Sequence, residues 1–199
     1  MWIRPVSVRP NGEVSERERQ YADGSDPKVL DVMDVPLLKP QPKGYQQENW
    51  LLDPKFDWSR KGRIGWDDLE RLADPLERLW FDGHKTYNGL NDRIPLDAAQ
   101  AVQSSLRLIR VKQLELRVFR PGEEFGDPKR RVQGRFVHAG ARYWLWVTDP
   151  LYERRYLQRS DGTYTIGECF LTISLGEPHK DACYKLIAAI IERNGGVRA

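Results

Sequence analysis

Hydrophobic and polar residues alternate with a period of two over much of the second half of the chain. Leu114, Leu116 and Val118, for example, alternate with Glu115 and Arg117. Such alternation is typical of a β-strand with one buried face. The runs that predict strands here are 106–110, 114–120, 132–138, 142–148, 164–175 and 183–191.

The first half of the chain has a weaker pattern. It predicts a strand over residues 2–7, then a polar loop with a short helix over 15–20. A β-branched run over 29–38 predicts a second strand, with Pro36 at its end or at a sheet edge. Residues 39–61 are rich in proline and aromatics and predict an irregular segment.

Helix signals occupy the middle of the chain and one later segment. The pattern predicts a helix over 67–72, restarted by Pro75 and continuing through Phe81, and a second helix over 97–105. A short charged helix is predicted over 150–159.

These elements predict a mainly β chain with short helices, in which two barrel-like halves are joined by a helical or irregular insertion. Short helices commonly join the strands of small β-barrels that bind oligonucleotides. The predicted parts are a first half over 1–60, a helical connector and loop over 61–105, a second barrel over 106–193 and a flexible tail over 194–199.

Composition excludes several classes of protein. Of the 199 residues 40% are hydrophobic and 31% charged, which is unlike a disordered chain. No apolar run is long enough to span a bilayer and the N-terminus lacks the apolar stretch of a signal peptide, so a cytoplasmic location is expected. The two cysteines, Cys169 and Cys183, and three scattered histidines form no metal-binding or disulfide pattern. We therefore expect both cysteines in the core, and no metal or other cofactor.

Positive charge is concentrated in one block. Residues 107–159 contain 13 Lys and Arg against 6 Asp and Glu, a net charge of +7, whereas the whole chain has +3. Such a block is the electrostatic footprint of a protein that binds phosphate backbones. A solvated basic face is the alternative, but aromatic residues interleaved with the block favour binding.

Motifs of catalysis are missing from the sequence. It has no phosphate-binding glycine loop, nucleophile elbow or zinc-hydrolase motif. The sequence therefore predicts a binding protein rather than an enzyme. A metal-dependent nuclease or hydrolase, with carboxylates such as Asp92 and Asp149 gathered by the fold, is the alternative.

One candidate binding segment is the loop YNGLNDR, residues 87–93. It places an aromatic, two amides, a carboxylate and a guanidinium close together, a set that can stack a base and hydrogen-bond its edge. The alternative is a turn whose Asn and Asp side chains satisfy their own backbone. The residues concerned are Tyr87, Asn88, Asn91, Asp92 and Arg93.

The second candidate is a predicted hairpin whose strands join at residues 139–141. Trp144 and Trp146 share one face of their strand, and Arg131 and Arg135 share one face of the partner strand. Together with the neighbouring Arg130 they would form a basic aromatic surface. The alternative is that both tryptophans are core residues.

The chain resembles a bacterial family, the dual OB-containing domain. The resemblance rests on segments found in order along nearly the whole chain: WIRPVS (2–7), 30–38, YNGLNDR (87–93), VTDP (147–150) with Tyr156, SLGEP (174–178) and CYKL (183–186). It implies two OB-like barrels and a role in binding nucleic acid or a nucleotide ligand, in stress or mobile-element defence. Arg4 in WIRPVS and Lys185 in CYKL therefore join the predicted nucleic-acid-binding residues.

Members of this family usually begin with a further strand and turn before the WIRPVS-like segment. Here Trp2 is the second residue. Either the start of the sequence is mis-set or trimmed, or the first barrel is incomplete. An incomplete barrel would expose an edge strand, which would favour a homodimer.

The predicted function is non-catalytic binding of single-stranded DNA or RNA with weak sequence preference. The alternative is a sensor of a small nucleotide-derived ligand. The predicted binding residues are Arg4, Tyr87, Asn88, Asn91, Asp92, Arg93, Arg130, Arg131, Arg135, Trp144, Trp146 and Lys185.

Overall fold

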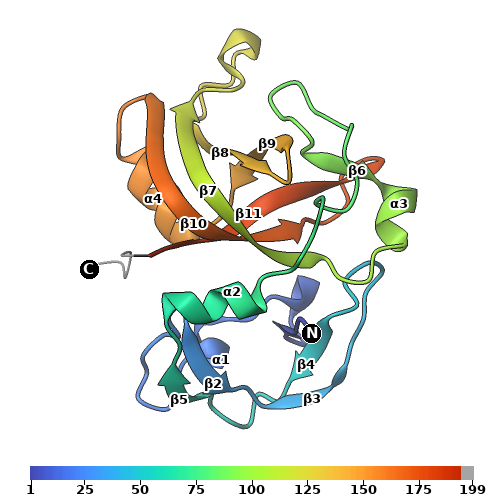
Figure 1. The fold of residues 1–199 in the computed structure, drawn as a ribbon. Helices are drawn as coiled ribbons and strands as arrows, with labels where there is room; N and C mark the ends of the chain where they lie inside the picture. The colour runs from blue at the N-terminus through green and yellow to red at the C-terminus, as the bar shows by residue number, and fades with distance from the viewer. Residues whose placement is uncertain (194–199) are drawn as a thin grey trace. The chain divides into compact units, whose positions relative to one another are not determined.

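The computed structural model describes residues 1–193 and divides the chain into two compact units (Figure 1). The first unit contains residues 1–69 and 103–105, and the second contains residues 70–102 together with those described from 106 onward. Residues 61–105 are thus shared between the units. The predicted flexible tail, 194–199, lies outside the described residues.

Two small sheets build the first unit. In one sheet β1 pairs in parallel with β4, and β4 pairs antiparallel with β3; in the other, β2 pairs antiparallel with β5. The elements of this unit are β1 (Arg4–Val6), η1 (Pro10–Gly12), α1 (Glu16–Arg19), β2 (Asp31–Asp34), β3 (Leu37–Pro40), β4 (Asn49–Leu52), β5 (Ser59–Arg63) and η2 (Trp66–Asp68). The next helix, α2 (Leu69–Leu72), begins in the first unit and ends in the second.

The second unit contains a closed five-stranded barrel. Its strands pair in the closed order β10-β7-β8-β9-β11, and β10 and β11 also pair with each other. The elements of the unit are β6 (Arg93–Pro95), α3 (Leu96–Gln100), β7 (Leu106–Phe119), η3 (Glu123–Phe125), β8 (Arg131–His138), β9 (Ala141–Val147), α4 (Pro150–Leu157), β10 (Gly162–Leu175) and β11 (Ala182–Glu192).

The connectivity of this barrel is that of an OB fold. Its first three strands form a meander, a helix follows the third strand, and the last strand pairs in parallel with the third at Leu186–Trp146 and Ile187–Val147. The expectation of a mainly β chain with a barrel and short helices is confirmed.

Alternating residues fill the barrel. Leu114, Leu116 and Val118 are at most 1% exposed, as the period of two predicts. At Gly134 the interior is so narrow that an added Cβ would lie 2.2 Å from Cδ1 of Ile187. Both cysteines are buried in strands β10 and β11, which confirms their expected place in the core.

The predicted helix from Pro75 through Phe81 is wrong, because the barrel supplies other partners for this backbone. Asp74 N–H donates to the Leu108 carbonyl (2.8 Å), and the Leu79 N–H donates to the Tyr143 hydroxyl (3.3 Å). Leu79 is fully buried. Residues 79–82, which we call the plug, therefore fold as an irregular segment onto the barrel strands.

Three other predicted elements differ in extent. The helix predicted over 97–105 is limited to α3 (Leu96–Gln100). The strand predicted over 29–38 is divided around Pro36 into β2 and β3, which belong to different sheets. The two strands predicted within 106–120 form one continuous strand, β7. In residues 1–193 no helix is long and apolar enough to cross a bilayer.

Candidate nucleic-acid interface

The outer face of β7, β8 and β9 carries aligned polar and aromatic side chains. The inward positions of these strands are buried, so the alternate positions point away from the barrel interior. Strand register places them in rows across the sheet: Glu115–Arg135–Trp144, Arg117–Gln133–Trp146 and Phe119–Arg131. Trp144 and Trp146 thus share a face, as predicted, and both are half-buried rather than in the core.

Each aromatic side chain of these rows has an arginine over its ring. The guanidinium carbon lies 4.3 Å from the ring centre for Arg135 and Trp144, 4.1 Å for Arg117 and Phe119, and 5.7 Å for Arg131 and Trp146. The Trp146 ring also stacks on Phe119, with 6.0 Å between ring centres. Two neighbours therefore pack against the Trp146 ring, whereas Trp144 has one such arginine.

Several cations of this face form no ion pair with a carboxylate, although Glu115 lies beside Arg135 in the same row. In the part of the chain that the structure describes, Arg117, Arg131, Arg135 and Arg142 form no ion pair, whereas Arg110 pairs with Glu70 and Glu168. Burial, together with the charge of Arg117, lowers the pKa of the Arg135 guanidinium, and the charge of Glu115 opposes this shift in part. Clustered cations that outnumber the nearby carboxylates favour binding of an anion such as a phosphate.

A groove of about 770 Å³ opens on this face beside the β8–β9 turn. Trp144 and Arg135 line it together with Lys112 and Arg142, and Glu115 is the carboxylate among its lining residues. Its volume lies within the range of small-ligand sites. Flat aromatic, cationic and amide groups therefore meet in one open depression.

Residues 83–92, which we call the strap, contain most of the predicted loop site. Asp92 is 1% exposed, and its carboxylate accepts hydrogen bonds from the backbone N–H (2.8 Å) and the hydroxyl (2.5 Å) of Thr86. The Asn91 side chain accepts from Gly83 N–H (2.7 Å) and donates to the Arg142 carbonyl (3.0 Å). These polar groups hold the strap together and fix it to β9.

The strap also reaches the middle of the outer face. The Gln133 side-chain amide donates to the Asn88 carbonyl (2.6 Å), and the Asn88 side chain donates to the Pro121 carbonyl (3.1 Å). Gln133 is fully buried although it lies on the outer face, because Asn88 and Arg135 both contact it. The exposed Tyr87 leans on Phe125, with 5.8 Å between ring centres, and its hydroxyl donates to Glu124 (3.2 Å).

Lys185, predicted to bind nucleic acid, lies in the core of the second unit. Its side chain is fully buried, and its ammonium donates to the carbonyl of Phe81 (2.6 Å) and to the Asp82 carboxylate (3.3 Å). Asp82 also accepts from the Tyr143 hydroxyl (3.0 Å). Burial lowers the pKa of Lys185 to about 8 and raises the pKa of Tyr143. This cluster fastens the plug to the barrel.

Two other arginines predicted to bind nucleic acid, Arg130 and Arg93, are engaged in contacts within the protein. Arg130 donates to the Asp161 carboxylate (2.7 Å) and to the carbonyls of Leu157 and Arg159, so its guanidinium joins α4 to the start of β10. Arg93 is half-buried in β6, where it pairs with Tyr184 of β11. The structure thus brings together Arg131, Arg135, Trp144 and Trp146, and places the other predicted residues of this unit around them or in the core.

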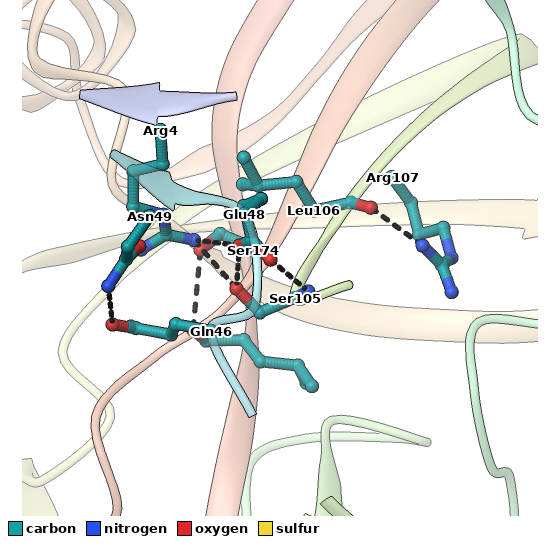
Figure 2. Close-up of polar contacts among 9 residues, drawn as sticks. Arg4, Gln46, Glu48, Asn49, Ser105, Leu106, Arg107 and Ser174 are labelled. Atoms are coloured by element: carbon teal, nitrogen blue, oxygen red, sulfur yellow. Dashed lines mark hydrogen bonds and ion pairs between the residues drawn. The ribbon is translucent and has the colours of Figure 1, made fainter. Parts of the chain in front are cut away.

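Arg4 belongs to the first unit and to a buried polar network there. Its guanidinium lies 3.3 Å from the Glu48 carboxylate and donates to the Ser105 hydroxyl (2.8 Å), as Figure 2 shows. The Ser105 N–H and hydroxyl both donate to Glu48, which is 5% exposed. The network connects residues distant in sequence within this unit, which gives Arg4 a structural role.

The prediction from sequence missed several residues of the outer face. Arg117 and Phe119 continue the rows on β7, and Lys112 and Arg142 line the groove. Their alternation with buried leucines and valines was visible in the sequence. What the sequence could not show was which strands are neighbours, and therefore which alternating faces combine.

The two carboxylates considered for catalysis are both engaged in structure. Asp149 caps α4 by accepting from Leu151 and Tyr152 N–H, and its other oxygen accepts from Ile190 N–H (3.0 Å). Within residues 1–193 no group of three or more His, Cys, Asp or Glu side chains is placed to hold a metal ion.

Comparison with known proteins gives one match. The family model of the dual OB-containing domain matches residues 1–190, nearly the whole chain. No curated protein and no solved structure matches the sequence. A dual OB domain is a fold suited to binding nucleic acids or nucleotides as a general class, and the fold alone specifies no particular ligand. Because the match covers nearly the whole chain and the barrel has the connectivity of an OB fold, the chain belongs to the dual OB-containing domain family.

Proposed function

We propose that the second unit binds single-stranded nucleic acid on the outer face of β7, β8 and β9. The observation that carries this proposal is the groove in which Trp144 meets Lys112, Arg135 and Arg142, three cations without a carboxylate partner among the described residues. In OB folds the face of the second and third strands is a common site for oligonucleotides, and here those strands are β8 and β9.

The chemistry of the groove favours an unpaired strand. Stacking on Trp144 requires the flat face of a base, which is covered by neighbouring bases in a duplex. Arginines and lysines bind phosphate through charge and do not read sequence. A surface that combines stacking with phosphate contacts binds single strands with weak sequence preference.

A salt titration tests this proposal. We expect labelled single-stranded DNA and RNA of about 12 nucleotides to raise their fluorescence anisotropy when the protein is added at low salt. Three phosphate contacts predict that the logarithm of the association constant falls with the logarithm of salt with a slope of about −2. A duplex of the same length should bind more weakly. No binding at low salt, or binding without a salt slope, would contradict the proposal.

A small nucleotide-derived ligand is the second candidate, because the volume of the groove suits one. A ligand that binds only the folded protein raises the melting temperature. Thermal-shift measurements with mono-, di- and cyclic nucleotides test this candidate. A flat response, with oligonucleotide binding intact, would remove it.

A further inference from the structure

Glu115 is a carboxylate in a groove that is otherwise lined by cations and neutral groups. It lies there together with Lys112, Arg135, Arg142 and Trp144. A carboxylate repels phosphate, so Glu115 adds nothing to the binding of a strand through its backbone. An ionised carboxylate only accepts hydrogen bonds. A ligand that gains from Glu115 must therefore present N–H or O–H donors to it.

The carboxylate of Glu115 is not used by the arginine beside it. Glu115 and Arg135 lie opposite each other in the β7–β8 ladder, a position in which opposite charges stabilise each other. The Arg135 guanidinium instead lies over the Trp144 ring, 4.3 Å from its centre, and donates from Nε to the Gln133 side chain (3.0 Å). Within residues 1–193 Glu115 forms no ion pair. Its carboxylate is therefore available to a ligand.

Gln113 supplies a donor next to this acceptor. Both residues line the groove, and their side chains lie on the same side of β7 because they are two positions apart. The Gln113 amide donates from Nε2 to Oε1 of Glu115 (3.4 Å), which fixes its nitrogen on the side of the carboxylate. That nitrogen carries a second N–H. The groove thus presents a neighbouring donor and acceptor on β7.

We infer that the groove prefers guanine, an inference that rests on the proposed function. Trp144 is two strands away from Glu115 in the same row, or about 10 Å. Bases stack on aromatic rings and on guanidinium planes, and they are read at their Watson–Crick edges. A base stacked on Trp144 and Arg135 can therefore turn that edge towards Gln113 and Glu115.

The hydrogen-bonding groups of guanine match this pair best. Its Watson–Crick edge presents the O6 acceptor followed by two donors, N1–H and the 2-amino group. Gln113 can donate to O6 while the Glu115 carboxylate accepts from both donors. Adenine, cytosine and thymine each offer the carboxylate one donor, with an acceptor beside it. The preference concerns the one nucleotide in the groove, so the rest of the strand is still bound with weak sequence preference.

Three oligonucleotides of about 12 nucleotides test this inference with the full chain. One alternates guanine and thymine, the second has hypoxanthine in place of guanine, and the third contains thymine alone. Hypoxanthine is a purine that lacks the 2-amino group, so it separates the reading of the base edge from stacking. In anisotropy titrations in lithium salt, which prevents guanine quadruplexes, the guanine strand should bind at least about fivefold more tightly than either of the others.

The possible results separate the two proposals. Equal affinity for the guanine and hypoxanthine strands would overturn the inference and leave the proposed function intact. Failure of every strand to bind would overturn the proposed function. If guanosine monophosphate then raised the melting temperature more than inosine monophosphate did, the guanine would come from a free nucleotide and the inference would stand.

Glu115→Gln tests the part played by the carboxylate. The change replaces an acceptor by an amide N–H, so the preference for guanine over hypoxanthine should fall to less than about twofold. Affinity for the thymine strand should rise, because a negative charge leaves the groove. The control Glu123→Gln removes the same charge at an exposed position that does not line the groove, and it should keep the preference. Melting curves would verify that both variants fold. An undiminished preference in folded Glu115→Gln protein would overturn the assignment of Glu115 as the residue that reads guanine.

Discussion

The strap and the outer face of β8 and β9 both contain residues that the sequence predicts to bind nucleic acid, but the structure uses those residues differently. In the strap, the side chains of Asn88, Asn91 and Asp92 bond to the protein itself. On the outer face, Arg131 and Arg135 lie over tryptophan rings and form no ion pair within the described residues. A cluster of binding-type residues in sequence therefore says little until their partners are known. Changes in the strap should alter stability, and changes on the outer face should alter affinity.

The largest expected effect concerns Lys185. This residue is a buried cation of the core and contrasts with the cations of the outer face. Its pKa of about 8 in the folded protein lies below the usual value of 10.5, so the unfolded chain binds more protons between these values. The free energy of unfolding should therefore rise with pH across this window, by up to about 3 kcal/mol relative to Lys185→Met. Urea unfolding at pH 8 and pH 10 measures this difference. Parallel pH profiles of the two proteins would contradict it.

Asp92→Asn tests the structural role of the strap. Replacing the buried carboxylate weakens its two bonds to Thr86, so the free energy of unfolding should fall by about 2 kcal/mol. Affinity for a linear single strand should stay within about twofold, or 0.4 kcal/mol. Asp181→Asn, at an exposed position, is the control and should change neither quantity. A large loss of affinity in a fully stable Asp92→Asn protein would make Asp92 a ligand contact.

Trp144→Ala tests the binding role of the outer face of β8 and β9. Removing the ring that stacks a base should weaken binding of single strands by about 1–3 kcal/mol. Fluorescence anisotropy measures the affinity, and a melting curve verifies that the barrel remains folded. Unchanged affinity would show that bases do not stack in the groove.

Arg135→Gln should have a smaller effect, seen mainly in the salt dependence. Losing one phosphate contact makes the salt slope shallower by about 0.7 for a single strand. Arg154→Gln removes the same charge from an exposed position on α4 and should leave the slope unchanged. Equal slopes for both variants would place the phosphate contacts elsewhere.

The smallest effect is expected for Tyr87→Ala. Tyr87 is 76% exposed, but its ring leans on Phe125 and it is not among the lining residues of the groove. Its loss should change affinity by less than about twofold. A tenfold loss of affinity in anisotropy titrations would instead place the binding site at the strap.

Much of the second unit could be predicted from the sequence, because its period-two pattern describes which residues face the core. The face shared by Trp144 and Trp146 followed directly from that pattern. The role of Arg130 did not, since its partner Asp161 lies 31 positions away, while the adjacent Arg131 faces outward. The irregular course of the segment after Asp74 could not be predicted from local sequence either. Its backbone bonds to residues of distant barrel strands, Asp74 to Leu108 and Leu79 to Tyr143.

The Arg4–Glu48–Ser105 network has a consequence for biosynthesis and for the choice of fragments. During translation, Glu48 emerges from the ribosome long before Ser105, so the first unit stays incomplete until the strap and the plug have been made. A fragment that stops at residue 69 would leave the buried Glu48 carboxylate without its two bonds from Ser105. Isolated production of this unit therefore calls for a design that restores residues 103–105, for example by a short linker in place of residues 70–102.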